Sequence, residues 1–283
     1  MITVTGATGN VGRTLVELLA GAGEEVVAVS RRPGLAADAG RDGVRWVRGG
    51  VGDAVSMRSA LEGSRAVFLV LGGELNFAGE SPDVLMDMIA DAGVERIVLV
   101  SSQVSATRPE APSHARLRAF EAAVRGSGRE STVLRPAGFA SNAFAWAESV
   151  RAKRTVFAPF GDVALPVVDP ADIAAVAAAA LREDGHAGRV YELTGPEPVS
   201  PRGQAAVLSA ALGEDVAFVE LSRAEAHAGM ARFMPEQVVT GTLDVLGAPL
   251  AAERRVSPDV AAVLGRPAAP FAEWVGRNLP AFV

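Results

Sequence analysis

The chain begins with a short apolar run that leads into three evenly spaced glycines and then into an amphipathic stretch. The sequence is ITVTGATGNVG over residues 2–12, and the amphipathic stretch covers 13–20. This order predicts a strand, a glycine turn and a helix. Gly6 can turn the chain sharply, Gly9 has no Cβ to block a pyrophosphate, and Gly12 lets the helix pack close to the strand. The helix N-terminus then offers free N–H groups to phosphates, so the turn predicts a dinucleotide site.

The glycine spacing by itself is a weak signal. It is GxxGxxG and not GxGxxG, and glycine supplies 30 of the 283 residues, so chance triplets occur. Its position directly after a strand and before a helix makes the signal specific. The alternative is an ordinary turn between strand and helix that binds nothing. We expect cofactor contacts along the turn from Gly6, Thr8, Gly9, Asn10, Val11 and Gly12.

Strand-like and helix-like segments alternate along the first half of the chain. Short β-branched runs at 25–30, 44–47, 66–71, 96–101 and 131–135 are predicted as fully buried strands. Helices are predicted near 10–22, 54–62, 81–92 and 113–126. The alternation predicts an α/β fold with a doubly wound parallel sheet, which binds ligands beyond the carboxyl ends of its strands.

Composition excludes several classes of function. The chain is long enough for one large domain or for a core with a smaller appendage. Cysteine is absent and the three histidines lack metal-ligand spacing, so no disulfide and no metal are expected. A net charge of −6 without a basic block argues against nucleic acid. Without a membrane-length apolar run or an export signal, we expect a cytoplasmic protein with no membrane partner; its oligomeric state stays open.

The predicted second strand ends in Ser30, Arg31 and Arg32, followed by Pro33. An NAD site usually carries an acidic residue here for the ribose hydroxyls. Two guanidinium groups without a carboxylate instead suit the 2′-phosphate of NADPH, so NADPH is the expected cofactor and NADH is disfavoured. The alternative is a solvated basic turn.

The ends of the other strands supply further candidates. Asp53 can lie against the adenine edge, and the glycines after the fourth strand allow the backbone close to a ribose. The cofactor candidates at all these strand ends are Ser30, Arg31, Arg32, Asp53, Leu71, Gly72, Gly73, Ser101, Pro136, Ala137 and Gly138.

Several segments together carry a family resemblance. They read TGATGNVG, SRRP, GVERIVLVSS, LRPAGFASN, LPVVDPADIAAVAAAAL and GRVYELTGPEPVS, within residues 1–221. The chain resembles atypical short-chain dehydrogenase/reductases of the NmrA-like type, close to quinone oxidoreductase type 2. The resemblance implies a Rossmann core at 1–157, to which about 170–194 return, and a smaller substrate-capping region at 158–283. It also implies that Phe139 and Asn142 face the nicotinamide or the substrate; the alternative is a packed core ring and a helix N-cap.

The chain departs from the wider superfamily at the usual proton donor. That donor is the tyrosine of a YxxxK pair, but here the one tyrosine, Tyr191, and the one lysine, Lys153, are far apart and in the wrong order. Where the pair would lie, residues 114–118 read HARLR. His114 is therefore a candidate substrate contact, although a lone histidine at a helix start is commonly exposed. Tyr191 falls in a predicted late strand at 190–193 and is interpreted as structural.

A reductase without this pair needs another source of the proton. Ser102 or Gln103 could donate it to the oxyanion that hydride transfer creates, as could water or the substrate itself. A quinone can take the proton from water, because its reduced oxygens are less basic than an alkoxide. The alternative is that the serines only cap the next helix.

The C-terminal third is expected to supply the substrate pocket. Two apolar segments, 157–160 and 230–235, look irregular enough to line a cleft, with Phe160 and Phe233 as substrate contacts. They would equally suit ordinary packing of the capping region. Residues 267–270 are expected to break the chain before a last helix at 271–279. The sequence thus favours an NADPH-dependent reductase of an apolar, aromatic ketone or quinone over a non-catalytic cofactor sensor.

Overall fold

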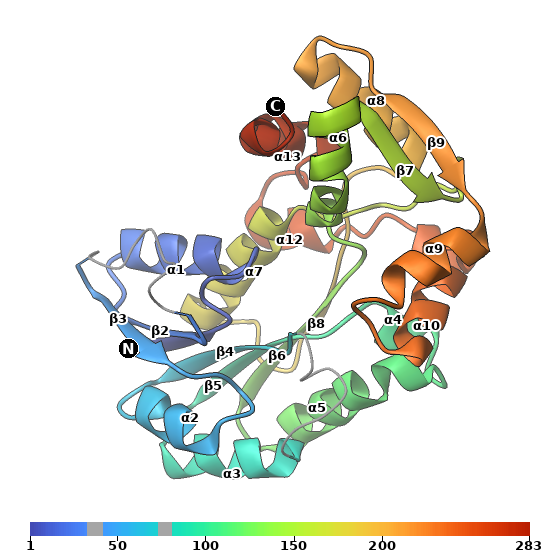
Figure 1. Cartoon of the computed structure of the whole chain (residues 1–283). Helices are drawn as coiled ribbons and strands as arrows, with labels where there is room; N and C mark the ends of the chain where they lie inside the picture. Colours follow the sequence, from blue (N-terminus) through green and yellow to red (C-terminus); the bar gives the residue numbers. More distant parts are fainter. Residues whose placement is uncertain (33–41, 73–80) are drawn as a thin grey trace.

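The computed structural model describes residues 1–32, 42–72 and 81–283, and a seven-stranded parallel sheet forms its centre (Figure 1). The strand order is β3-β2-β1-β4-β5-β6-β8. The strands are β1 (Ile2–Thr5), β2 (Val26–Ser30), β3 (Val44–Arg48), β4 (Ala66–Val70), β5 (Arg96–Val100), β6 (Glu130–Pro136) and β8 (Val190–Leu193). The predicted doubly wound sheet is confirmed, and the strands predicted after the glycine turn match to within one residue at each end.

Helices cover both faces of this sheet and enclose two hydrophobic cores (Figure 1). One face carries α1 (Gly12–Gly21), α7 (Pro170–Arg182) and α12 (Asp259–Leu264). The other face carries α2 (Ala54–Leu61), α3 (Pro82–Asp91) and α5 (Ala115–Gly126). Successive strand residues point to opposite faces, so Ala28 packs in the first core and Val27 in the second. Burial on both faces explains why most of these strands read as continuous apolar runs.

The prediction that 44–47 form a fully buried strand is wrong. β3 is the edge strand of the sheet and pairs only with β2. Val44, Trp46 and Val47 are half-buried, whereas Arg45 and Arg48 are exposed. An edge strand has one neighbour, and here both faces are only partly covered, Val44 and Trp46 by the first core and Val47 by the second, which the apolar residues alone did not reveal.

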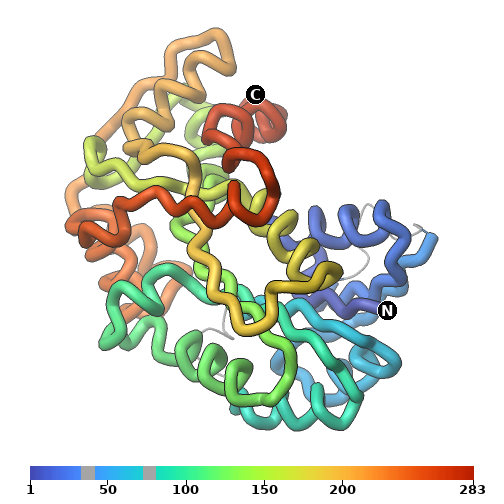
Figure 2. Tube along the Cα trace, turned by 180° about the vertical axis from the view of Figure 1, so that it is seen from behind, coloured from blue at the N-terminus to red at the C-terminus, as the bar shows by residue number. Residues whose placement is uncertain are grey.

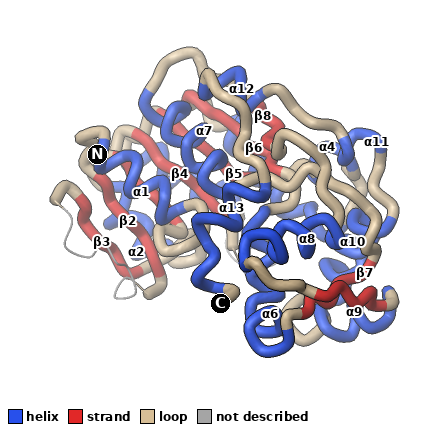
Figure 3. The backbone as a smooth tube through the Cα atoms, turned by 90° about the horizontal axis from the view of Figure 1, so that it is seen from above, coloured by secondary structure: helices blue, strands red, loops and turns tan. Residues whose placement is uncertain are grey.

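A smaller lobe is built around a second, two-stranded parallel sheet of β7 (Thr155–Pro159) and β9 (Ala217–Leu221). Its longer helices are α6 (Ala147–Lys153), α8 (Pro201–Leu212), α9 (Arg223–Met230), α10 (Glu236–Gly247) and α13 (Phe271–Asn278). Figure 3 shows this strand pair with α6, α8 and α9 around it, apart from the main sheet. Its core contains Phe271, Trp274 and Phe282, and the Trp274 ring contacts the other two rings. The predicted break before a last helix is confirmed.

The chain passes between the lobes more than once. After β7 it returns to the sheet as α7 and β8, and Figure 2 shows this yellow segment running between the two lobes. It returns again as α12, which packs on α7 and β8. Short elements lie between the lobes or beside them: α4 (Val104–Thr107), α11 (Ala251–Arg254) and the 3-10 helices η3 (Pro112–His114), η4 (Ala140–Trp146) and η5 (Leu279–Ala281). No helix in the described ranges has the length and apolar character needed to cross a bilayer.

Candidate functional site

The glycine turn lies at the carboxyl end of β1, in the middle of the sheet, where the strand order reverses. Gly6 adopts the left-handed region at φ +62°, and a Cβ there would lie 2.5 Å from Cγ1 of Val70. A Cβ on Gly12 would lie 2.2 Å from the Gly6 carbonyl oxygen. Gly6 and Gly9 are solvent-exposed. The turn therefore has the tight, open backbone that a pyrophosphate needs, and its residues fit a dinucleotide.

The polar side chains of the turn join it to neighbouring segments. The Thr8 and Ser30 hydroxyls are 2.8 Å apart, which ties the ends of β1 and β2 together. Asn10 donates from Nδ2 to the Ser141 hydroxyl on η4 at 3.0 Å. Val11 is buried among the residues of the first core, so only its backbone can reach a ligand. These contacts hold the backbone of the turn in one shape.

The end of β2 carries two exposed arginines, Arg31 and Arg32. The Arg32 backbone N–H donates to the Ser30 hydroxyl at 3.1 Å, which fixes where this loop leaves the sheet. Neither guanidinium forms a salt bridge with a residue of the described ranges. Pro33 lies outside those ranges. The place after β2 is thus positive and open, as a 2′-phosphate would require.

The candidates after β3 and β4 differ in accessibility. Asp53 caps α2, because its Oδ1 accepts from the N–H groups of Val55 at 3.2 Å and Ser56 at 3.3 Å. Leu71 is buried and Gly72 is exposed. Gly73 lies outside the described residues.

The three polar residues after β5 have different surroundings. Ser101 is buried and donates to Glu121, whose carboxylate also accepts from Arg135 at 3.0 Å. Gln103 is buried too, and its Nε2 donates to Glu192 at 2.6 Å. Ser102 is only half-buried; its oxygen accepts from the Val104 N–H at 3.2 Å, which leaves its own proton available. The Ser102 hydroxyl is therefore the most accessible of the three.

The candidates after β6 form a short run along one edge of the site. Pro136 and Ala137 are buried, and the Ala137 N–H donates to Leu193 at 2.9 Å, whereas Gly138 is exposed. Phe139 is half-buried against the first core and precedes η4. Asn142 lies within η4 with an exposed side chain, so it is not the N-cap that the sequence left as an alternative.

His114 ends η3 and lies one helical turn before Arg118. Its ring is half-buried, unlike that of a solvated histidine at a helix start, and Nδ1 lies 3.0 Å from the Ser113 hydroxyl. Burial, and secondarily the positive charge of Arg118, lowers the pKa of His114. His114 is therefore a neutral imidazole at neutral pH.

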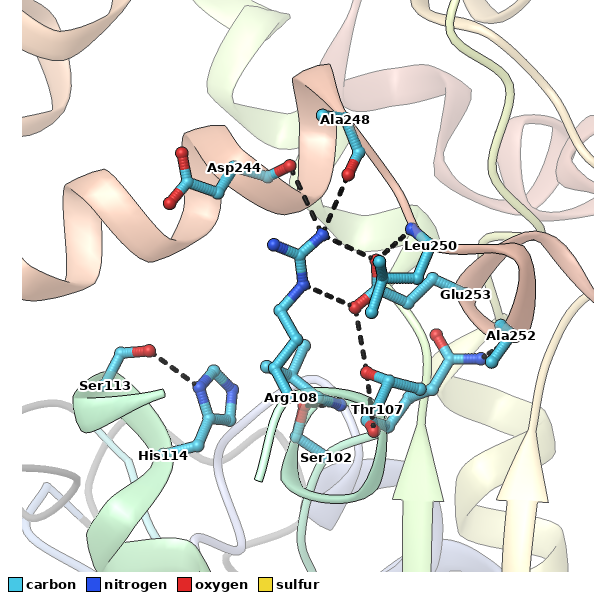
Figure 4. A network of polar contacts seen from close by, with 12 residues as sticks. Ser102, Thr107, Arg108, Ser113, His114, Asp244, Ala248, Leu250, Ala252 and Glu253 are labelled. Carbon is cyan, nitrogen blue, oxygen red and sulfur yellow. Dashed lines mark hydrogen bonds and ion pairs between the residues drawn. The ribbon is translucent and has the colours of Figure 1, made fainter. Parts of the chain in front are cut away.

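A pocket of about 680 Å³ lies between the segment that follows β5 and α10, next to the end of η3. Its walls come from 104–113, which contain α4 and η3, and from the N-terminal part of α10. Arg108 crosses the gap and makes a bidentate ion pair with Glu253 of α11, at 2.8 and 2.9 Å (Figure 4). Arg108 also donates to the Ala248 carbonyl at 2.9 Å. The carboxylate and guanidinium thus join the small lobe to the segment that follows β5.

The expected substrate contacts of the C-terminal third lie elsewhere. Residues 157–159 belong to β7 and are not irregular, and Phe160 packs against Gly247 of α10 in the left-handed conformation at φ +55°. Phe233 is 86% exposed after α9. Neither ring lines the pocket. The expectation of an irregular cleft lining is wrong for 157–160, because pairing with β9 and packing on α10 order that segment, whereas Pro235, at the end of 230–235, does line the pocket.

Tyr191 lies in β8, as predicted, and its hydroxyl is 2.8 Å from Nδ1 of His186. Lys153 ends α6 in the small lobe. The structure does not bring Tyr191 and Lys153 together as a catalytic pair. Sequence reasoning overlooked Arg108, Glu253 and Arg118. Of these three residues, only Arg118 could have been found from the sequence, because it follows His114 at the same spacing at which the lysine follows the tyrosine in a YxxxK pair.

Comparisons with known proteins agree with this geometry. A sequence model of the NAD(P)H-binding family matches residues 6–184. A (4-alkanoyl-5-oxo-2,5-dihydrofuran-3-yl)methyl phosphate reductase of Streptomyces griseus is 39% identical over all of this chain and 99% of its own length. An NAD(P)H azoreductase of Xenophilus azovorans is 31% identical over all of this chain and 99% of its own length. The NADPH complex of an Escherichia coli quinone oxidoreductase superposes with a TM-score of 0.81 at 26% identity, covering 99% of this chain and 100% of that one.

Proposed function

The chain belongs to the NAD(P)H-binding family, within the NmrA-like atypical short-chain dehydrogenase/reductases, and we propose that it transfers hydride from NADPH to an apolar, aromatic ketone or quinone. The observation that carries the proposal is the open glycine turn beside Arg31 and Arg32. Its relatives are named reductases and oxidoreductases. Their names differ in the group reduced, so the aromatic ketone or quinone is carried over from the expectation of the sequence and not from these names.

Each part of the site has a role in this proposal. NADPH supplies the hydride when it is bound. Gly6, Gly9 and Gly12 hold its pyrophosphate, and the arginines after β2 hold its 2′-phosphate. In this proposal the main sheet and its helices up to β6, together with α7 and β8, form the cofactor unit, and the small lobe, which begins with η4 and α6 and not at 158, caps the acceptor.

The protein has one candidate source of the proton. Ser102 offers an accessible hydroxyl after β5, whereas His114, beside the pocket, is a neutral imidazole and could only donate a hydrogen bond to the acceptor. Gln103 is a weaker donor, because its amide nitrogen already binds Glu192. A ketone needs such a donor to neutralise its alkoxide, whereas a quinone becomes a phenol, whose pKa of about 10 allows water to protonate it.

A screen of quinones and aromatic ketones for NADPH oxidation tests the proposal. General acid catalysis is typically worth about 10²–10⁴-fold, so Ser102→Ala should lower turnover of a ketone on that scale if Ser102 is the donor. Quinone turnover should change only a few-fold. NADPH binding without oxidation by any acceptor would contradict the reductase. That result would favour a cofactor sensor, which the engagement of Ser101 and Gln103 in internal contacts also suits.

A further inference from the structure

Asn10 offers two hydrogen-bond donors to two different parts of the site. Its backbone N–H, like that of Val11 next to it, donates to no acceptor among the described residues, so both N–H groups are available to the pyrophosphate of the proposed cofactor. Its side chain donates from Nδ2 to the Ser141 hydroxyl at 3.0 Å, across a sequence separation of 131 residues. One residue of the phosphate turn thus also contacts η4.

Ser141 belongs to the small lobe and is buried. The buried residues of η4 are Ala140, Ser141 and Ala143, and the two alanines pack in the core of the small lobe. The Asn10 amide is the one hydrogen-bond partner of the Ser141 hydroxyl within the described ranges. It also makes the only hydrogen bond that the described structure shows between the turn at 6–12 and this lobe. A buried hydroxyl without a partner is costly, so the folded small lobe favours this contact.

The neighbours of Ser141 are the residues expected to face the nicotinamide or the acceptor. Phe139 precedes η4, and Asn142 follows Ser141 with an exposed side chain. The Ala140 N–H donates to the Val168 carbonyl at 2.9 Å, which fixes the start of η4. The hydrogen bond from the phosphate turn fixes the next residue along. This bond therefore helps to set where the two neighbouring side chains lie relative to the turn.

We propose that Asn10 is a positioning residue for hydride transfer, because its hydrogen bond to Ser141 aligns η4 with the cofactor that its own backbone N–H helps to hold. This inference rests on the proposed function and adds to it the contact that aligns the acceptor side of the site with the cofactor side. A ligand that orders the turn also orders η4, since one residue contacts both. No hydride or proton passes through Asn10.

Hydrogen exchange measured by mass spectrometry tests this coupling without any acceptor. Saturating NADPH should slow exchange of the backbone amides at 139–146 about two- to tenfold in the parent, the range that the net free energy of one hydrogen bond allows. Ser141→Ala should bind NADPH as tightly as the parent in calorimetry, keep the protection at 6–12 and lose that at 139–146. The matched control is Ser149→Ala, whose hydroxyl donates to the Trp146 carbonyl within the small lobe, and it should behave as the parent does.

Asn10→Ala repeats the test from the other partner and should also lose the protection at 139–146, so the test does not depend on one variant. No protection of this segment in the parent, or equal protection in Ser141→Ala, overturns the proposal. Weaker NADPH binding by Ser141→Ala would mean that Ser141 contacts the cofactor itself, and this result overturns it too.

Steady-state kinetics with an acceptor separate alignment from binding. At saturating NADPH, Ser141→Ala should lower kcat about two- to tenfold and leave the KM for NADPH unchanged, because the phosphate contacts are intact. In the Asn10→Ala background the same change should have no further effect, since the hydrogen bond is already absent. Additive losses, or an unchanged kcat, overturn the proposal. Failure of every acceptor to oxidise NADPH contradicts the reductase, whereas the exchange measurement still decides whether Asn10 couples the turn to η4.

Discussion

The carbonyl oxygen of Gly6 decides which residue can occupy position 12. A side chain at Gly12 would push its Cβ to 2.2 Å from that oxygen and 2.7 Å from the Gly6 carbonyl carbon. Both are backbone atoms, so no side-chain rotation relieves the clash. Gly21, at the other end of α1, has no atom within 4 Å of where its Cβ would lie. The same helix thus contains a required glycine and a permissive one.

Gly12→Ala should therefore move α1 away from β1 and damage both folding and cofactor binding. Overpacking of this kind typically costs about 1–3 kcal/mol, and cofactor affinity should fall with it because the displaced residues form the phosphate turn. Gly21→Ala is the control and should be neutral or stabilising by about 0.5–1 kcal/mol. Urea unfolding and NADPH titration measure both effects. Equal stability of the two variants would contradict the packing argument.

In the proposed site we expect Arg31 and Arg32 to determine the choice of cofactor. Each can form a charge-assisted bond to the 2′-phosphate, and such bonds are worth roughly 1.5–3 kcal/mol. Replacing both with alanine should weaken NADPH binding by about one to three orders of magnitude, at tenfold per ~1.4 kcal/mol. NADH binding should change little, and Arg45→Ala, an exposed arginine on β3, is the control. Equal losses for the two cofactors would show that these arginines do not read the 2′-phosphate.

At the scale of the elements, short segments join the two lobes. α4 follows β5, α11 lies in the chain between α10 of the small lobe and α12, and the ion pair of Arg108 and Glu253 connects the two short helices. The Glu253 side chain is fully buried and also accepts from the Thr107 hydroxyl and the Leu250 N–H, each at 2.8 Å. Burial alone would raise the pKa of Glu253, but these donors outweigh it and lower the pKa below its ordinary value.

Glu253→Gln should destabilise the protein in a pH-dependent way. Removing one partner of a buried ion pair typically costs about 3–5 kcal/mol, and the partial exposure of Arg108 places the cost at or below the low end. Because the folded pKa is lowered, the carboxylate stabilises the fold above its unfolded pKa, and this contribution is lost as the pH falls through the folded value. The difference in unfolding free energy between parent and variant should therefore shrink in acid. Glu214→Gln, which breaks an exposed pair with Arg154, should change little; a pH-independent effect of Glu253→Gln would contradict the assignment.

The strands of the main sheet and those of the small lobe differ in how far the sequence predicts them. The buried strands of the main sheet were predictable, because a parallel sheet covered on both faces requires unbroken β-branched runs. β7 and β9 were not, because each pairs with a partner about 60 residues away and exposes alternate residues. The glycine turn was predictable from local spacing. The buried contacts of Ser101 and Gln103 were not, since Glu121 and Glu192 reach them only through the tertiary fold.

The whole molecule consists of two lobes joined by several chain crossings and by ion pairs of buried carboxylates. α7 and β8 return to the main sheet, α12 packs on both, and Arg277 of α13 pairs with Asp169, the N-cap of α7. The small lobe is therefore attached, through α13, to the start of α7, one of the helices that cover the main sheet. We expect the two lobes to unfold together.

Cofactor binding should accordingly stabilise the entire chain. A ligand at a hundred times its dissociation constant adds about 2.7 kcal/mol to the folded state. For a domain somewhat smaller than this one, each kcal/mol raises Tm by about 2–4 °C, so saturating NADPH should raise it by about 5–10 °C. Calorimetry should show one transition that moves as a whole, and at the same NADPH concentration the shift should fall to half or less when Arg31 and Arg32 are both alanine. Two transitions, of which NADPH moves only one, would show that the contacts of α12, α13 and Glu253 do not couple the lobes.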